Sequence, residues 1–230
     1  MSGAAKFVWF DFGGVLSPPL SELFDSYATR TGIPSDVLQQ AMKSIGTEYA
    51  LPTLAPIELA LLDERTWVAK QHDYINREHP DVDTTLAEPE FGRQWFSGHS
   101  PNSDMRQFAV DLVEEGTRIG ILSNNVVEWE PYWRAMVDLD EGATVIIDSC
   151  RVGVRKPDPE IFAIAADAAS VAAEDCVLID DLPENCAAAC RAGWTAVQYI
   201  TAEQAIAGVR RVLTESSPQS LSLIHISEPT

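Results

Sequence analysis

Residues 7–16, with the sequence FVWFDFGGVL, constrain the fold of this chain more than any other stretch. Four apolar residues end at the carboxylate of Asp11, and two glycines follow at once. A short apolar run bounded by glycine and proline is typical of a buried strand, so we expect Asp11 at the carboxyl end of a strand, where open α/β sheets bind ligands. The glycines, which lack a Cβ atom, would let the backbone approach a small ligand closely. The same residues also fit an ordinary turn, and the partners of Asp11 elsewhere in the chain decide between the two interpretations.

Composition narrows the classes of partner. The chain of 230 residues is 46% hydrophobic and carries a formal net charge of −19, which disfavours nucleic acids and anionic membranes as ligands. No apolar run is long enough to span a bilayer, and no signal peptide opens the sequence. We interpret the four cysteines as packing thiols in a reducing compartment. A cytoplasmic protein is therefore expected, with its oligomeric state undetermined.

Residues 18–97 show apolar side chains at helical spacing and no strand pattern. Leu23, Phe24 and Tyr27 define one helical face, and Asp63 is placed to cap a helix that follows it. We therefore predict a helical insertion over these residues. Four aromatic side chains could line a pocket there, although packing inside the insertion is their more common role: Trp67, Tyr74, Trp95 and Phe96.

From residue 98 to residue 215 short apolar runs alternate with helical patterns. We predict strands over residues 118–122, 144–147, 176–179 and 195–200, and helices from Pro101, from Pro159 to about residue 169, over 184–192 and over 202–213. Such alternation implies a parallel sheet covered by helices on both faces. The predicted fold class is α/β, a Rossmann-like parallel sheet sandwiched by helices, with residues 1–17 and 98–215 forming the core and residues 18–97 inserted into it as a helical cap.

The last fifteen residues are treated separately. Residues 216–220 resemble a linker, and residues 221–230, LSLIHISEPT, resemble the conceptual translation of a transposase-based sequencing adapter. We predict that residues 216–230 are a linker and an assembly artefact and exclude them from the fold. A natural disordered tail is the alternative.

Polar residues follow three of the predicted strands. Asp11 ends the first, Ser123 and Asn124 follow another, and Asp180 and Asp181 follow a third. Since parallel strands place their carboxyl ends at one edge of the sheet, we expect these side chains to converge, together with Lys156 from the start of a helix. Each residue alone has a structural explanation, as a turn former, a surface cation or a helix cap. Their order and placement favour a functional site.

Four motifs in this order resemble the haloacid dehalogenase-like hydrolase superfamily: residues 10–16 (FDFGGVL), 122–124 (LSN), 154–159 (VRKPDP) and 179–181 (IDD). The resemblance covers nearly all of residues 5–213 and is greatest for the subfamily I phosphatases, which carry a helical cap after the first strand. The N-terminal phosphatase domain of soluble epoxide hydrolases is a similar relative. The resemblance implies a hydrolase core with a cap that selects the substrate.

The resemblance also implies roles for individual residues. Asp11 would attack phosphorus and form an aspartyl-phosphate, which splits one difficult displacement into two easier steps. Lys156 would neutralise the transferring oxygens, and Ser123 and the Asn124 backbone N–H would donate hydrogen bonds to them. A Mg²⁺ ion would be held by Asp11, the Gly13 carbonyl and Asp181, with Asp180 close by. The implied activity is a Mg²⁺-dependent phosphatase acting on a small phosphorylated metabolite.

One position departs from the family pattern. The phosphatases of the superfamily usually have a second aspartate two positions after the nucleophile, as general acid and base, and this chain has Gly13 there. General acid–base help is worth about 10²–10⁴ in rate. Without this acid and base the enzyme could be slow, could prefer substrates with good leaving groups, or could take the proton from water or from a cap residue. The absence of the second aspartate also disfavours phosphomutase activity.

Two other functions stay open at this point. A metal-independent haloacid dehalogenase would need no acid at Gly13, because halide leaves without a proton, but Asp180 and Asp181 resemble a metal site. A catalytically idle binding module is the other alternative, and the complete set Asp11, Ser123, Lys156 and Asp181 argues against it. Nothing in the predicted cap identifies a substrate.

Overall fold

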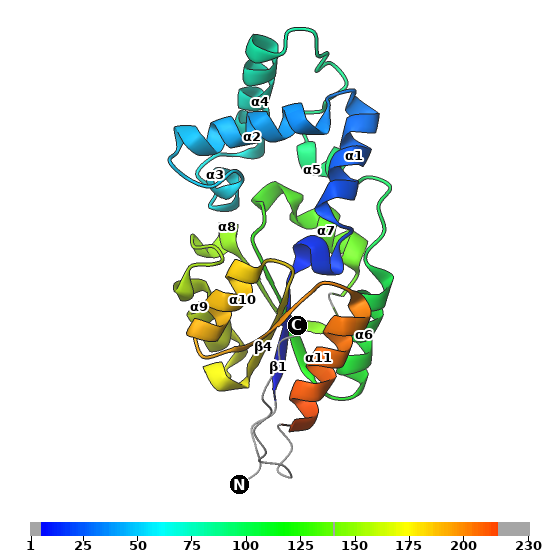
Figure 1. Cartoon of the computed structure of the whole chain (residues 1–230), viewed down its shortest axis with the longest axis vertical. Helices are drawn as coiled ribbons and strands as arrows, with labels where there is room; N and C mark the ends of the chain where they lie inside the picture. Colours follow the sequence, from blue (N-terminus) through cyan, green and yellow to red (C-terminus); the bar gives the residue numbers. More distant parts are fainter. Residues whose placement is uncertain (1–5, 140, 216–230) are drawn as a thin grey trace, which may run out of the picture.

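The strands form one parallel sheet in the order β3-β2-β1-β4-β5, in a computed structural model that describes residues 6–139 and 141–215 (Figure 1). The strands are β1 (Phe7–Phe10), β2 (Arg118–Ser123), β3 (Ala143–Asp148), β4 (Cys176–Asp180) and β5 (Thr195–Gln198). The predicted linker and adapter residues, 216–230, lie outside the described residues. This arrangement confirms the predicted fold class. No helix in the described ranges is long and apolar enough to cross a membrane.

Strand β1 is the centre of the sheet. Phe7 lies opposite Arg118 of β2 on one side and opposite Cys176 of β4 on the other. All four β1 residues are buried, as an uninterrupted apolar run predicts for a strand covered on both faces. The connections from β1 to β2 and from β3 to β4 lead to opposite sides of β1, so the carboxyl end of β1 is the topological switch point at which such sheets bind ligands.

Helices cover both faces of the sheet, and the side chains of β1 alternate between them. Val8 and Phe10 pack in the hydrophobic cluster that includes α6 (Ser103–Glu114) and α11 (Ala202–Glu215), while Phe7 and Trp9 pack against α9 (Pro159–Ala169) and α10 (Pro183–Arg191). Asp158 caps α9 by accepting a hydrogen bond from the Glu160 N–H at 2.9 Å, with Pro159 in the first turn. The aromatic and aliphatic side chains of β1 therefore anchor both layers.

Five helices, here called the cap, gather beyond the carboxyl edge of the sheet (Figure 1). They are α1 (Leu20–Thr31), α2 (Ser35–Glu48), α3 (Ala55–Glu58), α4 (Glu64–Glu78) and α5 (Phe91–Phe96). Contacts between aromatic rings join α1, α4 and α5: Phe91 lies 4.7 Å from Tyr27 and 5.1 Å from both Trp67 and Trp95, measured between ring centroids. The predicted helices are present, whereas the division of the chain at residues 17/18 and 97/98 stays a prediction.

Local differences from the sequence prediction have identifiable causes. Within the predicted helical insertion, α3 stops at Glu58, and Ala60 beyond it has a left-handed backbone with φ of 52°. Helix α7 (Glu130–Val137) was not predicted, since its buried face consists of Trp133 and Val137 alone and gives little periodicity. The short helix α8 (Ser149–Val152) was also missed.

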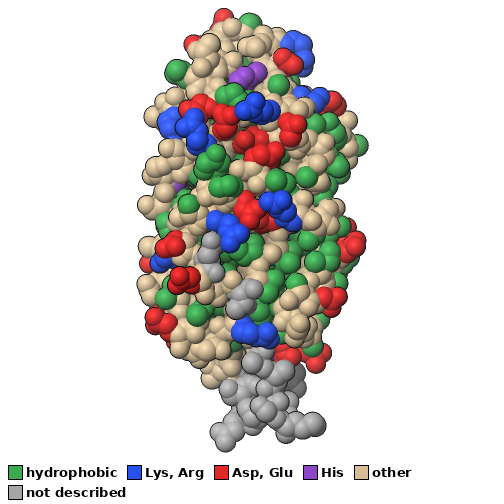
Figure 2. Space-filling model, turned by 180° about the vertical axis from the view of Figure 1, so that it is seen from behind, with side chains coloured by type: hydrophobic (Ala, Val, Ile, Leu, Met, Phe, Trp, Pro, Cys, Tyr) green, Lys and Arg blue, Asp and Glu red, His purple; other side chains and the backbone are tan. Residues whose placement is uncertain are grey.

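Charged side chains of both signs are interspersed on the face opposite to that of Figure 1. In Figure 2 basic side chains lie beside acidic ones instead of forming a patch of their own. Arg210 and Glu115, for example, form an ion pair between α11 and the carboxyl end of α6. The excess of acidic residues in the sequence is therefore partly compensated locally on the protein surface.

Candidate active site

Asp11 lies where β1 ends, at the floor of a cavity between the sheet and the cap. Its backbone N–H donates to the Ile179 carbonyl at 2.8 Å, and its Oδ1 accepts from the Phe12 N–H at 2.7 Å. The residue is only 6% exposed. The chain then turns sharply through η1 (Phe12–Leu16), which the Ser17 N–H closes by donating to the Phe12 carbonyl at 2.8 Å. Asp11 thus lines a cavity to which cap residues such as Glu58 also contribute.

The side chain of Lys156 contacts the carboxyl ends of three strands, β1, β2 and β4. Its Nζ lies 2.9 Å from Asp11 Oδ1 and 2.6 Å from Asp180 Oδ2, and it also donates to the Leu122 carbonyl at 2.8 Å. The side chain of Asn124 holds the Lys156 backbone on both sides, donating to its carbonyl at 2.9 Å and accepting from its N–H at 2.8 Å. The ammonium group is therefore fixed against the predicted nucleophile in a position that is 1% exposed.

Asp180 is fully buried, and both of its oxygens accept hydrogen bonds from protein groups. Oδ1 accepts from the Leu182 N–H at 3.0 Å and from Asn185 Nδ2 at 2.9 Å, while Oδ2 faces Lys156. Asn185 on α10 was not identified from the sequence. Its spacing of four residues from Asp181, at the start of a helix after the strand, is the signal that could have found it. These contacts favour a role for Asp180 in orienting Lys156.

Asp181 approaches the glycine turn closely. A Cβ atom on Gly14, which has φ of +72°, would lie 2.6 Å from Asp181 Oδ2, so only glycine fits there without displacing the carboxylate. Gly13 differs, because its φ of −64° and ψ of 121° suit any residue and a Cβ there would meet no atom within 4 Å. One carboxylate oxygen from each of Asp11, Asp180 and Asp181 lies within 4.8 Å of the others. This is an oxygen-ligand cluster of the kind that Mg²⁺ prefers.

The electrostatics of the cluster reflect burial and crowding. Burial raises the pKa of Asp11 to about 8, with Lys156 opposing the rise and Asp180 adding to it. Burial and the neighbouring Asp180 also raise the pKa of Asp181. Burial alone would lower the Lys156 pKa, but the carboxylates of Asp11 and Asp180 raise it above its ordinary value. Three carboxyl groups thus face one ammonium group, an imbalance that a divalent cation would correct.

Ser123 ends β2 beside this cluster, as predicted. It is 1% exposed, and its Oγ has no hydrogen-bond partner among the described residues. Buried hydroxyl groups are rarely left unpaired in native proteins, so this atom is available to a bound molecule or water. The neighbouring Asn125 has a second unpaired donor, Nδ2, and lines the cavity.

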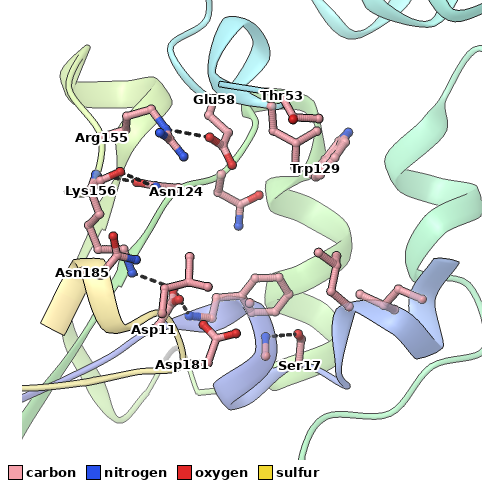
Figure 3. Close-up of a pocket in the computed structure, with 18 of the residues that line it drawn as sticks. Asp11, Ser17, Thr53, Glu58, Asn124, Trp129, Arg155, Lys156, Asp181 and Asn185 are labelled. Carbon is pink, nitrogen blue, oxygen red and sulfur yellow. Dashed lines mark hydrogen bonds and ion pairs between the residues drawn. The ribbon is translucent and has the colours of Figure 1, made fainter. Parts of the chain in front are cut away.

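The cavity above Asp11 has a volume of about 330 Å³. Figure 3 shows Asp11 and Asp181 on its floor and Glu58 of the cap opposite them. Apolar walls come from both the cap and the core: Phe12, Leu20, Leu23, Trp95, Phe96 and Trp129. Trp95 and Phe96 therefore line the cavity as the sequence allowed, while Trp67 and Tyr74 do not belong to its lining.

The structure brings the predicted site residues together at one edge of the sheet. Asp11, Gly13, Asn124, Lys156 and Asp181 all line the cavity, and the buried side chains of Ser123 and Asp180 lie at the strand ends beside it. Sequence reasoning missed Glu58, Asn125 and Trp129, which belong to no recognisable motif. Arg155 stood inside a quoted motif without a role, and it forms an ion pair with Glu58 in which Nε lies 2.8 Å from Oε2.

Comparisons with known proteins agree with this geometry. A family model described as haloacid dehalogenase-like hydrolase matches residues 5–193. Bifunctional epoxide hydrolase 2 of Mus musculus is 23% identical over 226 residues, which cover 94% of this chain and 40% of the mouse protein, so the chain spans less than half the length of this relative.

Two solved structures share the fold. One is a haloacid dehalogenase family enzyme from Bacteroides thetaiotaomicron in complex with magnesium and inorganic phosphate, with a TM-score of 0.59 and 17% identity over 85% of this chain and 94% of that one. The other is L-2-haloacid dehalogenase from Xanthobacter autotrophicus with chloropropionic acid covalently bound, with a TM-score of 0.60 and 16% identity over 85% and 77% of the two chains. With the family model matching most of its length, the chain belongs to the haloacid dehalogenase-like hydrolases.

Proposed function

We propose that this hydrolase is a Mg²⁺-dependent phosphatase that acts on a small phosphorylated metabolite through an aspartyl-phosphate on Asp11. The observation that carries the proposal is the cluster of Asp11, Asp180 and Asp181, whose carboxylate oxygens lie within 4.8 Å of one another beside a single lysine. Such a cluster would repel an anionic substrate strongly without a cation, because like charges at this separation interact strongly in a poorly hydrated site.

The oxygen ligands present fit Mg²⁺. Asp11, the Gly13 carbonyl and Asp181 would hold the ion, and Asp180, whose oxygens already face protein donors, would support it from behind. The bound ion would supply positive charge that reduces repulsion between a phosphate dianion and Asp11. The unpaired Ser123 Oγ is consistent with a phosphoryl oxygen as the missing partner.

The protein groups would share the work of the first displacement. Asp11 attacks phosphorus as the nucleophile, and Lys156, 2.9 Å from its Oδ1, neutralises charge on the transferring oxygens. The side chain of Asn124 is occupied by the Lys156 backbone, so only its N–H would serve the substrate. Ser123 donates a hydrogen bond to the phosphoryl group.

The relatives offer support for the phosphatase and for one competitor. The Bacteroides enzyme holds magnesium and inorganic phosphate in its crystal structure, and the mouse relative is a bifunctional epoxide hydrolase, in keeping with the resemblance seen in the sequence. The Xanthobacter enzyme is a dehalogenase of equally similar fold, and Gly13 suits a halide leaving group that takes no proton. The acidic cluster favours the phosphatase, since it offers carboxylate ligands for a cation that a metal-independent dehalogenase would not need.

A metabolite screen separates these activities. Phosphorylated metabolites and 2-haloacids are incubated with the protein, with and without Mg²⁺, and phosphate and halide release are measured. Asp11→Asn should abolish phosphate release, and chelation should do so reversibly, while Asp167→Asn on the exposed surface of α9 should behave as wild type. Full activity in excess chelator, or halide release without phosphate release, would overturn the proposal.

A further inference from the structure

Glu58 is a buried carboxylate that the cap contributes to the cavity. It is the last residue of α3, is 7% exposed, and lines the same cavity as Asp11. Figure 3 shows Glu58 and Asp11 on opposite walls. The roles proposed above for the other site residues leave this side chain without a function in the reaction.

Two contacts with the core hold Glu58 in place. Arg155 Nε donates to its Oε2 at 2.8 Å, and Ser149 Oγ donates to its backbone carbonyl at 2.7 Å. The second carboxylate oxygen, Oε1, accepts no hydrogen bond from the described residues. Glu58 is therefore oriented by the core while one oxygen stays available to a molecule in the cavity.

The geometry of phosphoryl transfer gives that oxygen a task. The attacking and leaving oxygens lie roughly in line on opposite sides of phosphorus. With Asp11 attacking from the floor, the leaving oxygen must point toward the cap, where Glu58 lies. The water that later attacks the aspartyl-phosphate arrives from the same side.

We infer that Glu58 is the general acid and base of this active site, taking the place of the side chain that Gly13 lacks; the inference rests on the proposed phosphatase function. In the first step an Asp11–phosphorus bond forms, the ester P–O bond breaks, and the leaving oxygen takes a proton from Glu58. In the second step water attacks phosphorus and gives a proton to the Glu58 carboxylate, and the bond to Asp11 breaks. The sum is phosphate ester plus water to alcohol plus phosphate.

The surroundings of Glu58 suit a group that changes protonation. Burial raises its pKa above the ordinary value, while Arg155, followed by Lys156, opposes the rise. A buried carboxyl group beside an arginine can therefore donate a proton without leaving an unpaired charge behind, because Arg155 stabilises the carboxylate that results. Gly13, by contrast, has room for a side chain but supplies none.

Glu58→Gln tests the inference against a matched control, Glu64→Gln. Glu64 is also a buried cap glutamate with a pKa raised by burial, but both hydrogen bonds to its Oε1 come from protein groups, the Gly92 N–H of the cap at 2.6 Å and Trp129 Nε1 of the core at 2.8 Å. Glu64 is not part of the cavity lining. Both substitutions keep the shape of the side chain and remove only the carboxyl group.

Each variant is assayed with phosphate esters whose leaving alcohols range from aryl to alkyl. For Glu58→Gln, kcat/KM should fall about 10²- to 10⁴-fold with alkyl esters and hardly change with p-nitrophenyl phosphate, whose leaving group needs no proton. With p-nitrophenyl phosphate kcat should fall, because the second step lacks its base. Intact-mass spectrometry should then detect one added phosphoryl group on Glu58→Gln, and none on wild type or Glu64→Gln.

Introducing Gly13→Asp into Glu58→Gln should restore part of the lost alkyl-ester activity. If Glu58→Gln hydrolyses alkyl esters as well as Glu64→Gln does, or accumulates no intermediate, Glu58 is not the acid and base, while the phosphatase itself stands. If Asp11→Asn leaves phosphate release intact, both proposals fall. Should Glu58→Gln not fold, Glu58→Asp replaces it with the same expected pattern, since its carboxyl group is withdrawn from the leaving oxygen but keeps its charge beside Arg155.

Discussion

Replacing Lys156 by methionine should lower the stability of this protein, and the loss should grow above pH 8. Lys156 Nζ makes contacts of 2.9 Å with Asp11, 2.6 Å with Asp180 and 2.8 Å with the Leu122 carbonyl, in a position 1% exposed. Removing one partner of a buried ion pair leaves uncompensated charge and costs about 3–5 kcal/mol. We expect a loss of that size at pH 8 in metal-free buffer.

The loss should grow as the pH rises above 8. Lys156 opposes the effect of burial on the Asp11 carboxyl group, so without it the pKa of Asp11 rises above the value of about 8 in the native protein. Above pH 8 the folded variant therefore keeps a proton on Asp11 that the folded native protein and both unfolded chains, with an ordinary Asp pKa near 3.8, have released. Relative to the native protein, the variant then loses about 1.4 kcal/mol of stability for each further pH unit, up to its own Asp11 pKa.

Urea unfolding followed by tryptophan fluorescence at pH 8 and pH 9.5, with a chelator present, measures both effects. Lys70→Met is the matched control, because Lys70 pairs with Glu48 at 2.7 Å on the surface, where such pairs contribute about 0–1 kcal/mol. The slope of the free energy of unfolding against urea concentration should be the same for the native protein and both variants, so that differences in the unfolding midpoint report differences in stability. A Lys156→Met loss no larger than that of Lys70→Met, at both pH values, would refute this reasoning.

Two further substitutions test the electrostatics and the glycine turn. Burial, and to a smaller extent Glu130, raise the pKa of Asp148 from 3.8 to about 7. The Asp148 carboxyl group therefore destabilises the fold by an amount that is zero below pH 4 and grows up to pH 7. Asp148→Asn should raise the free energy of unfolding by up to about 4 kcal/mol at pH 8 and leave it unchanged at pH 3.5, which denaturant titrations at both pH values would measure. Gly14→Ala should weaken Mg²⁺ binding in calorimetric titrations, because the added methyl group would lie 2.6 Å from Asp181 Oδ2. Gly32 is the control, since it also has a positive φ of +76° but no atom lies within 4 Å of an added Cβ. Gly32→Ala should therefore lower stability by about 1 kcal/mol and leave Mg²⁺ binding intact.

Much of the fold follows from local signals in the sequence. The run FVWF ending at Asp11 predicts a central buried strand, and the pair Asp158–Pro159 predicts the start of α9, because strand burial and helix capping depend on residues that are neighbours in the chain. Helix α7 was not predicted, since only Trp133 and Val137 are buried against the protein core and two residues do not define a helical period.

Part of the candidate site could also be predicted from the sequence, and part could not. Asp11, Ser123, Lys156 and Asp181 stand at strand ends or a helix start within recognisable motifs, so their convergence follows from a parallel sheet. The ion pairs between these residues cannot be predicted from the sequence alone. Whether Lys156 contacts both Asp11 and Asp180 depends on the lateral order of β2, β1 and β4 in the sheet.

Glu58 is the residue that only the tertiary structure identifies. It belongs to no motif and lies in a segment predicted merely to be helical, 97 residues from its partner Arg155. Its place opposite Asp11 depends on how the cap rests on the core, through the contact between Ser149 Oγ and the Glu58 carbonyl. Local patterns determine which segments are helices and strands, but contacts between distant segments determine which carboxylates share a cavity, because burial and pairing energies arise only after the chain has packed.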